Sequence, residues 1–393
     1  MNKSVFLCSP FRTPIGSLMG ELSSVSAPKL ASSVIRKIIS ENNLSSESID
    51  EVILGCVLTS GIGQAPARQA AIFSKLSDKT PCTTIGKVCG SGLKSIMIGA
   101  NSIMAGSNNL VLAGGMENMS QAPHLLSKVR TGYRLGHGEL RDSMIIDGLW
   151  DVYNDFHMGF AAEKCANKYK LSREQQDEYA TNSYKRAIAA TEKGLFKNEV
   201  VEIEVKKRKE VVSVASDEEL ARVKFEKFSK LKPVFDPQGT ITAANASSIN
   251  DGASAMLVAS EDAVKKFNLK PFARIVSQAQ TAGAPEWFST APATSITKLL
   301  AQAKLTTKDI DFWEINEAFA AVALANMKIL ELESENVNVR GGAIAMGHPI
   351  GASGARILTT MLHTLVEEKK KYGVASLCIG GGEAVSMLVE NLR

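Results

Sequence analysis

The stretch "NLVLAGGMENM", residues 109–119, joins an apolar strand to a glycine pair, an acidic residue and a methionine. The same order returns in "ASLCIGGGEAVSM", residues 375–387. A second pair of similar segments has the same arrangement, because "CGSGLKSI" at 89–96 matches "GASGARIL" at 351–358 and each resembles the start of a helix. Two matches in the same order predict two copies of one α/β unit of about 120 residues, stacked back to back, with helices between and around two sheets.

The segments around these repeats predict the domain organisation. Strand-like and helix-like segments alternate through the first 120 residues, which is typical of parallel strands joined by helical crossovers. The next part of the chain holds a charged helix-like stretch, "LSREQQDEYATNSYKRAIAATEKG", and two basic runs, and the alternating pattern then returns at "GASAMLVAS". We predict an N-terminal half at 1–120 that is completed by 250–270, an inserted loop domain at 121–249, and a C-terminal half at 271–393.

The composition narrows the functional class. The 393 residues are 45% hydrophobic and 22% charged, as in an ordinary soluble globular protein. A net charge of +4 argues against general nucleic-acid binding but permits a local anion site, for example at "VKKRKE" (205–210) or "RVKFEKFSKLKP" (222–233). The alternative interpretation is that these basic runs simply form solvent-exposed surface. We find neither a secretion signal nor an apolar run of membrane-spanning length, and therefore expect a cytoplasmic protein without a membrane partner.

The cysteines and histidines argue against a disulfide framework and against a metal site. Six cysteines are scattered without CxxC spacing, which indicates a reducing compartment. His348 has no second histidine at metal-ligand spacing, so we expect no metal.

Cys89 lies where the strand-like "TTIG" turns into a helix, and Gly90 and Gly92 permit a tight backbone there. Unpaired N–H groups and the helix dipole favour a thiolate at such a position, so we expect a pKa below about 8.5. A buried structural thiol is the alternative. A buried helix after Cys89 is predicted by apolar residues at three- and four-residue steps, namely Leu93, Ile96, Met97, Ala100, Ile103 and Met104.

Three further stretches hold polar or glycine-rich sequences that a fold alone does not require. These are "EINEAFAAV" (314–322) with Asn316, "GGAIAMGHPIGASGAR" (341–356) with His348, and "LCIGGGEA" (377–384) with Cys378. Asn316 could equally be a helix N-cap, and a histidine in a tight turn is often structural. A cysteine nucleophile needs a base such as histidine, and acyl transfer needs backbone N–H donors at glycine-rich turns. The set therefore indicates acyl chemistry on a thiol.

Six ordered motifs resemble the thiolase family across essentially the whole chain: "VCGSGLKSI", "AGGMENMS", "NASSINDGA", "INEAFA", "GGAIAMGHPIGASGAR" and "CIGGG". The resemblance implies two βαβαβαββ halves in five α-β-α-β-α layers, an inserted loop domain and a homotetramer. It also implies acetyl-CoA, acetoacetyl-CoA and CoA as substrates and products, with no resident cofactor.

The resemblance further implies a role for individual residues. Cys89 would accept the acyl group, His348 would activate it, and Cys378 would exchange the α-proton. Asn316 with His348 would hold a water in one oxyanion hole, and the N–H groups of Cys89 and Gly380 would form the other. The residues implied in substrate and CoA binding are Leu149, His157, Met158, Phe235, Ser247, Ala318 and Phe319, with Arg222 and Lys227 as possible phosphate contacts.

Some positions depart from the family pattern. Glu383 follows the glycine cluster where Met or Gln is usual, and we expect its carboxylate to raise the pKa of Cys378 if the two lie close. Ala65 replaces a usual asparagine.

The leading interpretation is reversible condensation of two acetyl-CoA molecules into acetoacetyl-CoA and CoA through an acetyl-Cys89 intermediate. The sequence "HMG" at 157–159 favours short acyl groups. The alternatives are a degradative 3-ketoacyl-CoA thiolase of broader chain length and, in another class, a non-catalytic acyl-CoA binding protein.

Overall fold

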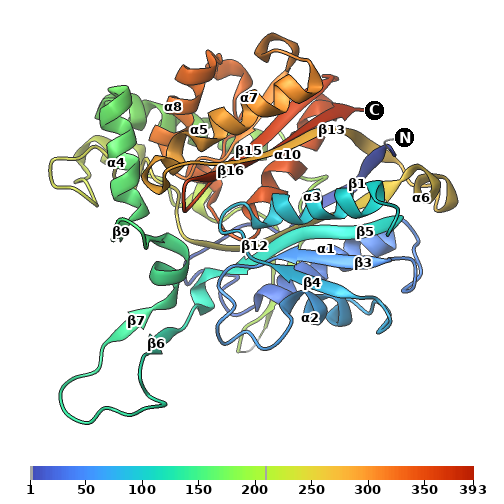
Figure 1. Ribbon diagram of the computed structural model, residues 1–393, viewed down its shortest axis with the longest axis horizontal. Coiled ribbons are helices and arrows are strands. Elements are labelled where there is room, and N and C mark those ends of the chain that lie inside the picture. Colours follow the sequence, from blue (N-terminus) through green and yellow to red (C-terminus); the bar gives the residue numbers. More distant parts are fainter. Residues whose placement is uncertain (1–2, 209) are drawn as a thin grey trace.

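The computed structural model describes residues 3–208 and 210–393 and contains the two similar halves that the repeats predict (Figure 1). The N-terminal half consists of β1 (Val5–Arg12), β2 (Gly16–Ser17), α1 (Ala27–Glu41), β3 (Glu51–Gly55), α2 (Pro66–Phe73), β4 (Cys82–Ile85), α3 (Ser91–Met104) and β5 (Leu110–Asn118), with β12 (Asn250–Ser260) added after the inserted segment. Its strand order is β1-β12-β5-β3-β4. Strand β3 is parallel to β4 and β5, whereas β12 is antiparallel to β1 and β5.

The C-terminal half repeats this order. It consists of β13 (Pro271–Ala282), α7 (Ala291–Ala303), β14 (Phe312–Ile315), α8 (Ala320–Leu330), α9 (Ala343–Met346), α10 (Ser353–Glu367), β15 (Tyr372–Ile379) and β16 (Glu383–Asn391), and α6 (Glu261–Lys266) connects it to the first half. Its strand order is β13-β16-β15-β14. The expected counterpart of β4 is reduced to an isolated bridge between Trp313 and Val337. This half therefore keeps the βαβαβαββ order, with its third strand reduced to that bridge.

The two halves share one sheet. Strand β1 pairs antiparallel with β13 through Phe6–Arg274, Leu7–Ala273 and Cys8–Pro271. The result is a continuous 10-stranded sheet, where the sequence had predicted two separate ones. The short pairing lets the two parts of the sheet face each other across a helical layer.

Helices α3 and α10 form that middle layer, between the two parts of the sheet (Figure 1). The predicted apolar face of α3 is buried except for Met104, which ends the helix and is largely exposed. The helix starts touch closely, because a Cβ on Gly354 would lie 2.3 Å from the backbone nitrogen of Leu93 and one on Gly92 would lie 2.8 Å from that of Ala355. Only glycine permits this approach.

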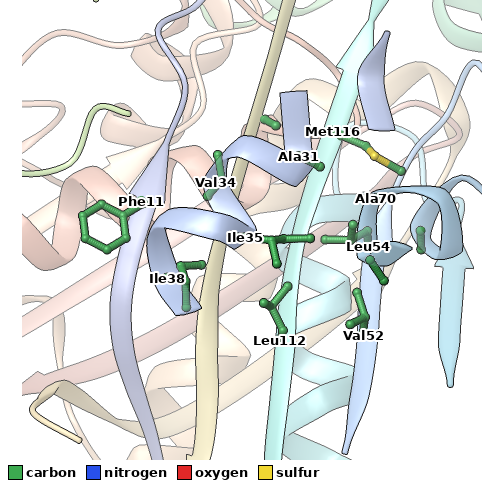
Figure 2. Packing of buried hydrophobic residues seen from close by; sticks show 14 of the residues in the cluster. Phe11, Ala31, Val34, Ile35, Ile38, Val52, Leu54, Ala70, Leu112 and Met116 are labelled. Atoms are coloured by element: carbon green, nitrogen blue, oxygen red, sulfur yellow. The ribbon is translucent and has the colours of Figure 1, made fainter. Parts of the chain in front are cut away.

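Outer helices cover the remaining sheet faces and complete the five layers. On the N-terminal side, α1 and α2 pack on β3, β5 and β12. Apolar residues of α1 recur at helical spacing and point at the sheet, which explains why this segment forms a buried amphipathic helix. Figure 2 shows this cluster with Phe11, Ala31, Val34, Ile35, Ile38, Val52, Leu54, Ala70, Leu112 and Met116 labelled. On the other side, α7 packs on β13, β15 and β16.

The inserted segment forms short two-stranded sheets and the two helices α4 and α5. Its elements are β6 (His124–Leu126), β7 (Leu140–Asp142), a π-helical turn (Ile145–Leu149), β8 (Trp150–Asp151), β9 (Phe156–His157), α4 (Met158–Tyr169), α5 (Arg173–Glu192), β10 (Ile203–Lys206) and β11 (Val211–Val214). The β6–β7 hairpin extends away from the rest of the molecule (Figure 1). Among the described residues, no helix combines the length and apolar character needed to cross a bilayer.

Candidate active site

Cys89 lies in the turn between β4 and α3, as the sequence predicts. The hydroxyl of Ser91, the first residue of α3, accepts a hydrogen bond from the N–H of Lys87 at 2.8 Å and donates one to the carbonyl of Val88 at 2.7 Å. Val88 has φ +44°, an uncommon conformation for a β-branched residue that this network holds in place. Gly90 is required by close approach, because a Cβ there would lie 2.4 Å from Cδ1 of Ile379.

The expected low pKa of Cys89 is wrong for this structure. Burial raises the pKa of the thiol to about 11, although the backbone N–H groups of Gly380 and Cys89 itself lower it. The helix start alone does not compensate for the loss of water around the sulfur. The thiol is therefore protonated at rest and needs a base. The two N–H groups that lower this pKa come from opposite halves of the protein.

His348 lies in the loop between α9 and α10, in a fixed orientation. Its backbone N–H donates to Oδ1 of Asn250 at 2.9 Å, and its Nδ1 lies 2.6 Å from the hydroxyl of Ser353. That hydroxyl donates its own proton to the carbonyl of Pro349 at 2.9 Å, so Nδ1 of His348 must carry the hydrogen. Nε2 is then the free base. Burial and the charge of Arg356 lower the pKa of His348 to about 3, which keeps the imidazole neutral.

Asn316 follows β14 and contacts His348, with its Nδ2 3.4 Å from Nε2. It is not an N-cap, because α8 begins at Ala320 with Phe319 as its N-cap. Within the described chain, its buried Oδ1 has no hydrogen-bond partner. Buried amide oxygens are normally paired, so this orphaned acceptor fits a site that receives a polar group from outside the protein.

Cys378 is the next-to-last residue of β15 and is buried in an apolar cluster with Met158, Phe288 and Phe319. Burial raises its pKa well above the ordinary value, and the neighbouring Cys89 raises it further. Glu383 is not among the causes of this shift, and its carboxylate forms an ion pair with Lys87. The condition for an effect of Glu383 on Cys378, that the two lie close, is therefore not met.

A cavity of about 290 Å³ is lined by Cys89, His348 and Gly380. Most of the residues that the sequence implicates line it: Cys89, Leu149, His157, Met158, Phe235, Ser247, Ala318, Phe319, His348 and Gly380. Asn316 and Cys378 contact its lining residues. Sequence reasoning missed Phe288, Ile249 and Ile350; the last two lie inside recognised motifs, whereas nothing in its local sequence identifies Phe288. A larger groove of about 1060 Å³ near the chain end contains none of the implicated residues.

Two side chains that line the cavity, His157 and Ser247, are held by neighbouring residues. The ring of His157 stacks on Phe235 with centroids 4.8 Å apart, and its Nδ1 accepts the N–H of Gly159 at 3.0 Å. The hydroxyl of Ser247 donates to the carbonyl of Ala318 at 3.0 Å and leaves its lone pairs to the cavity. These contacts hold the walls without a ligand.

Arg222 and Lys227 do not line the cavity. Both side chains are exposed on the inserted lobe, and the guanidinium of Arg222 lies 4.0 Å from Glu218. The six cysteines are free thiols, and among the described residues no group of three or more His, Cys, Asp or Glu is placed to hold a metal ion.

Comparison with known proteins gives a consistent result over the full length. The family model "Thiolase, N-terminal domain" matches residues 5–262, and "Thiolase, C-terminal domain" matches 269–391. The cytosolic acetyl-CoA acetyltransferase ERG10 of Gibberella zeae is 46% identical over 391 residues, covering 99% of this chain and 98% of the relative.

Two solved structures are also similar. The Acat5 thiolase of Ascaris suum, solved in complex with coenzyme A, has a TM-score of 0.94 and 43% identity, with 99% of this chain and all of that one covered. Human mitochondrial 3-ketoacyl-CoA thiolase has a TM-score of 0.96 and 39% identity, with 99% of each chain covered.

Proposed function

The chain belongs to the thiolase family, and on that premise we propose that it condenses two acetyl-CoA molecules reversibly into acetoacetyl-CoA and CoA. The observation that carries the proposal is the meeting of Cys89, neutral His348 and the Gly380 turn in one cavity. The acetyl-CoA acetyltransferase activity named for the Gibberella relative supports the same reaction.

The first half-reaction transfers an acetyl group to Cys89. Nε2 of His348 takes the proton of Cys89 while the sulfur attacks the thioester carbonyl. The backbone N–H groups of Cys89 and Gly380 receive the negative oxygen, and such donors are each worth about 10²–10³ in rate. The carbon–sulfur bond to CoA then breaks, and the departing CoA thiolate takes a proton from Cys378. Acetyl-Cys89, a Cys378 thiolate and protonated His348 remain.

The second half-reaction forms the carbon–carbon bond. The Cys378 thiolate removes an α-proton from a second acetyl-CoA, while protonated His348 and Asn316 stabilise the enolate oxygen. The enolate carbon attacks the acetyl carbonyl on Cys89, and the Cys89 thiolate leaves and takes back the proton from His348. The cycle needs no resident cofactor.

We also propose that the protein prefers short acyl groups, binds the CoA phosphates at its surface, lies in the cytoplasm and forms a homotetramer. His157 and Phe235 narrow the cavity, and Arg222 and Lys227 would contact CoA phosphates at the protein surface. Relatives are named both cytosolic and mitochondrial; we propose the cytoplasm. A homotetramer is supported by the protruding β6–β7 hairpin (Figure 1), whose residue Leu135 is fully exposed.

The test compares cleavage of 3-ketoacyl-CoA substrates of increasing length, together with labelling by acetyl-CoA. We expect acetoacetyl-CoA to be cleaved far better than a substrate of eight or more carbons, and the acetyl label to lie on Cys89. Equal kcat/KM on the long substrate would favour the degradative 3-ketoacyl-CoA thiolase that the human structure exemplifies. Absence of label in a folded Cys89→Ala variant completes the assignment, whereas a label on Cys378 would contradict it.

A further inference from the structure

The two N–H groups proposed to bind the oxyanion come from different halves of the protein. The N–H of Cys89 belongs to the turn before α3, and that of Gly380 belongs to the turn between β15 and β16. Both groups lower the pKa of the Cys89 thiol, and Cys89 and Gly380 line the same cavity. Catalysis by such a pair depends on how accurately the two turns are held against each other, because small misplacements of reacting groups cost large factors in rate.

The glycine turn has few side-chain contacts of its own to fix it. Gly381 and Gly382 have φ +93° and +82°, and a Cβ at Gly381 would find no atom within 4 Å. The pairing of Ile379 with Glu383 closes the turn, and the N–H of Gly283 donates to the carbonyl of Gly382 at 2.9 Å, so backbone pairing ties the turn to its own half. These contacts do not connect the turn to Cys89.

Gly90 packs against Ile379 at the end of β15, and an ion pair adds a polar connection between the two turns. Glu383 is the first residue of β16, directly after the glycine turn, and its Oε2 pairs with Nζ of Lys87, two residues before Cys89. The backbone of Lys87 is itself fixed to Ser91 at the start of α3. The side chains are only 21% and 37% exposed, so the pair is partly shielded from water.

A second lysine, Lys94, lies on α3. Burial and the charge of Lys87 lower the pKa of Lys94, and the charge of Glu383 raises it. Lys94 in turn donates to Oε1 of Gln280 on β13 at 2.8 Å. Glu383 therefore offsets the repulsion between two lysines that flank the Cys89 turn, and methionine or glutamine at that position could not.

We propose that Lys87 and Glu383 are positioning residues that clamp the Gly380 turn against the Cys89 turn and so align the two oxyanion donors. This inference rests on the proposed function, because the clamp matters only if acetylation of Cys89 uses those donors. Neither side chain lines the cavity or touches the reacting atoms. The clamp should therefore affect the rate of acyl transfer more than the binding of substrate.

The experiment measures single-turnover acetylation of Cys89 by acetyl-CoA in Glu383→Gln, Lys87→Met, the double variant, and the charge-reversed pair Lys87→Glu with Glu383→Lys. Complete loss of a donor costs about 10²–10³ in rate, so a loosened donor should cost about tenfold. We expect each single variant to lose about tenfold in acetylation rate with KM for acetyl-CoA within about twofold. The double variant should be no worse than either single one, and the reversed pair should recover part of the rate.

Two controls keep the result specific. Glu261→Gln removes a different lysine–glutamate pair, with Lys265 on α6, and should leave acetylation unchanged. Raising the salt concentration should slow the wild-type protein toward the variants and leave the variants themselves unaffected, because salt screens partly exposed charges.

Unchanged acetylation in the single variants, or losses that multiply in the double variant, would overturn the clamp. If the wild-type protein forms no acetyl-Cys89 at all, the proposed function fails instead. The two failures are therefore distinguishable.

Discussion

Replacing Cys378 by serine should separate the two half-reactions. The change exchanges one sulfur for an oxygen in the apolar cluster of Met158, Phe288 and Phe319. The pKa of a hydroxyl lies far above that of a thiol, and burial together with Cys89 already holds the pKa of Cys378 well above its ordinary value. Serine at this position therefore cannot act as the base.

The size of the effect follows from the role assigned to the thiol. A positioned acid/base contributes typically about 10²–10⁴ in rate, which corresponds to about 3–5 kcal/mol of activation free energy. The new hydroxyl is also buried among apolar side chains, so we expect the free energy of unfolding to fall by about 1–3 kcal/mol. Because this cost is modest, the variant should remain folded at 25 °C and can be assayed.

The assay follows exchange of the acetyl-CoA methyl protons with deuterated solvent, beside acetylation of Cys89. The Cys378→Ser variant should still form acetyl-Cys89, more slowly because the leaving CoA thiolate loses its proton donor, and should lose exchange and condensation by about 10²–10⁴. Cys89→Ala should lose all acyl transfer. If Cys378→Ser kept wild-type deuterium exchange, the second thiol would not be the base and the mechanism would be refuted.

Four further predictions test individual residues. Ser353→Ala removes the acceptor that keeps the hydrogen on Nδ1 of His348, so acetylation should slow about fivefold, the equivalent of one hydrogen bond; an unchanged single-turnover rate would contradict this. Burial raises the pKa of Glu117 to about 7, above its unfolded value, so its stabilising effect is complete below pH 4.5 and is lost as the pH rises through 7. Urea unfolding should therefore favour the wild-type protein over Glu117→Gln by roughly 3 kcal/mol more at pH 4.5 than at 7.5, and a difference independent of pH would be the opposing result. Ala65 has φ +51° before α2, so Ala65→Asn should raise the free energy of unfolding by about 1 kcal/mol, which thermal unfolding can check against the wild type. Leu135→Asp, in the protruding β6–β7 hairpin, should lower the mass of the assembly measured by analytical ultracentrifugation below that of a tetramer. An unaltered mass would show that the hairpin does not hold the tetramer together.

The duplication could be predicted because its signals are local. Glycines at the starts of α3 and α10 and apolar runs in β5 and β15 mark the same positions in each half. In the C-terminal half, the strand equivalent to β4 is reduced to a single bridge. This reduction could not be predicted, because the pairing of so short a strand depends on its neighbours in space. The joining of both halves into one sheet likewise needs contacts between β1 and β13, more than 250 residues apart in the chain.

In the candidate active site, too, local sequence predicted some features, and others depended on the tertiary structure. Motifs of a few residues each identified Cys89, His348, Asn316 and Cys378, because a nucleophile, a base and N–H donors need particular residue types in tight turns. The sequence did not reveal Ser353 as the residue that fixes the His348 tautomer. Arg222 and Lys227 were implicated by their charge, but the structure leaves them outside the cavity.

By itself, the sequence determined the duplicated α/β halves and the residue types that perform the chemistry, since periodicity, glycine spacing and side-chain type are properties of neighbours along the chain. The tertiary structure alone decided the protonation of those residues and the partner of Glu383. Desolvation raises the pKa of Cys89 to about 11 and lowers that of His348 to about 3, and it depends on segments far away in the sequence. Lys87 reaches Glu383 only because the turn before α3 packs against the end of β15, where β16 begins, although the two residues lie 296 positions apart in the chain.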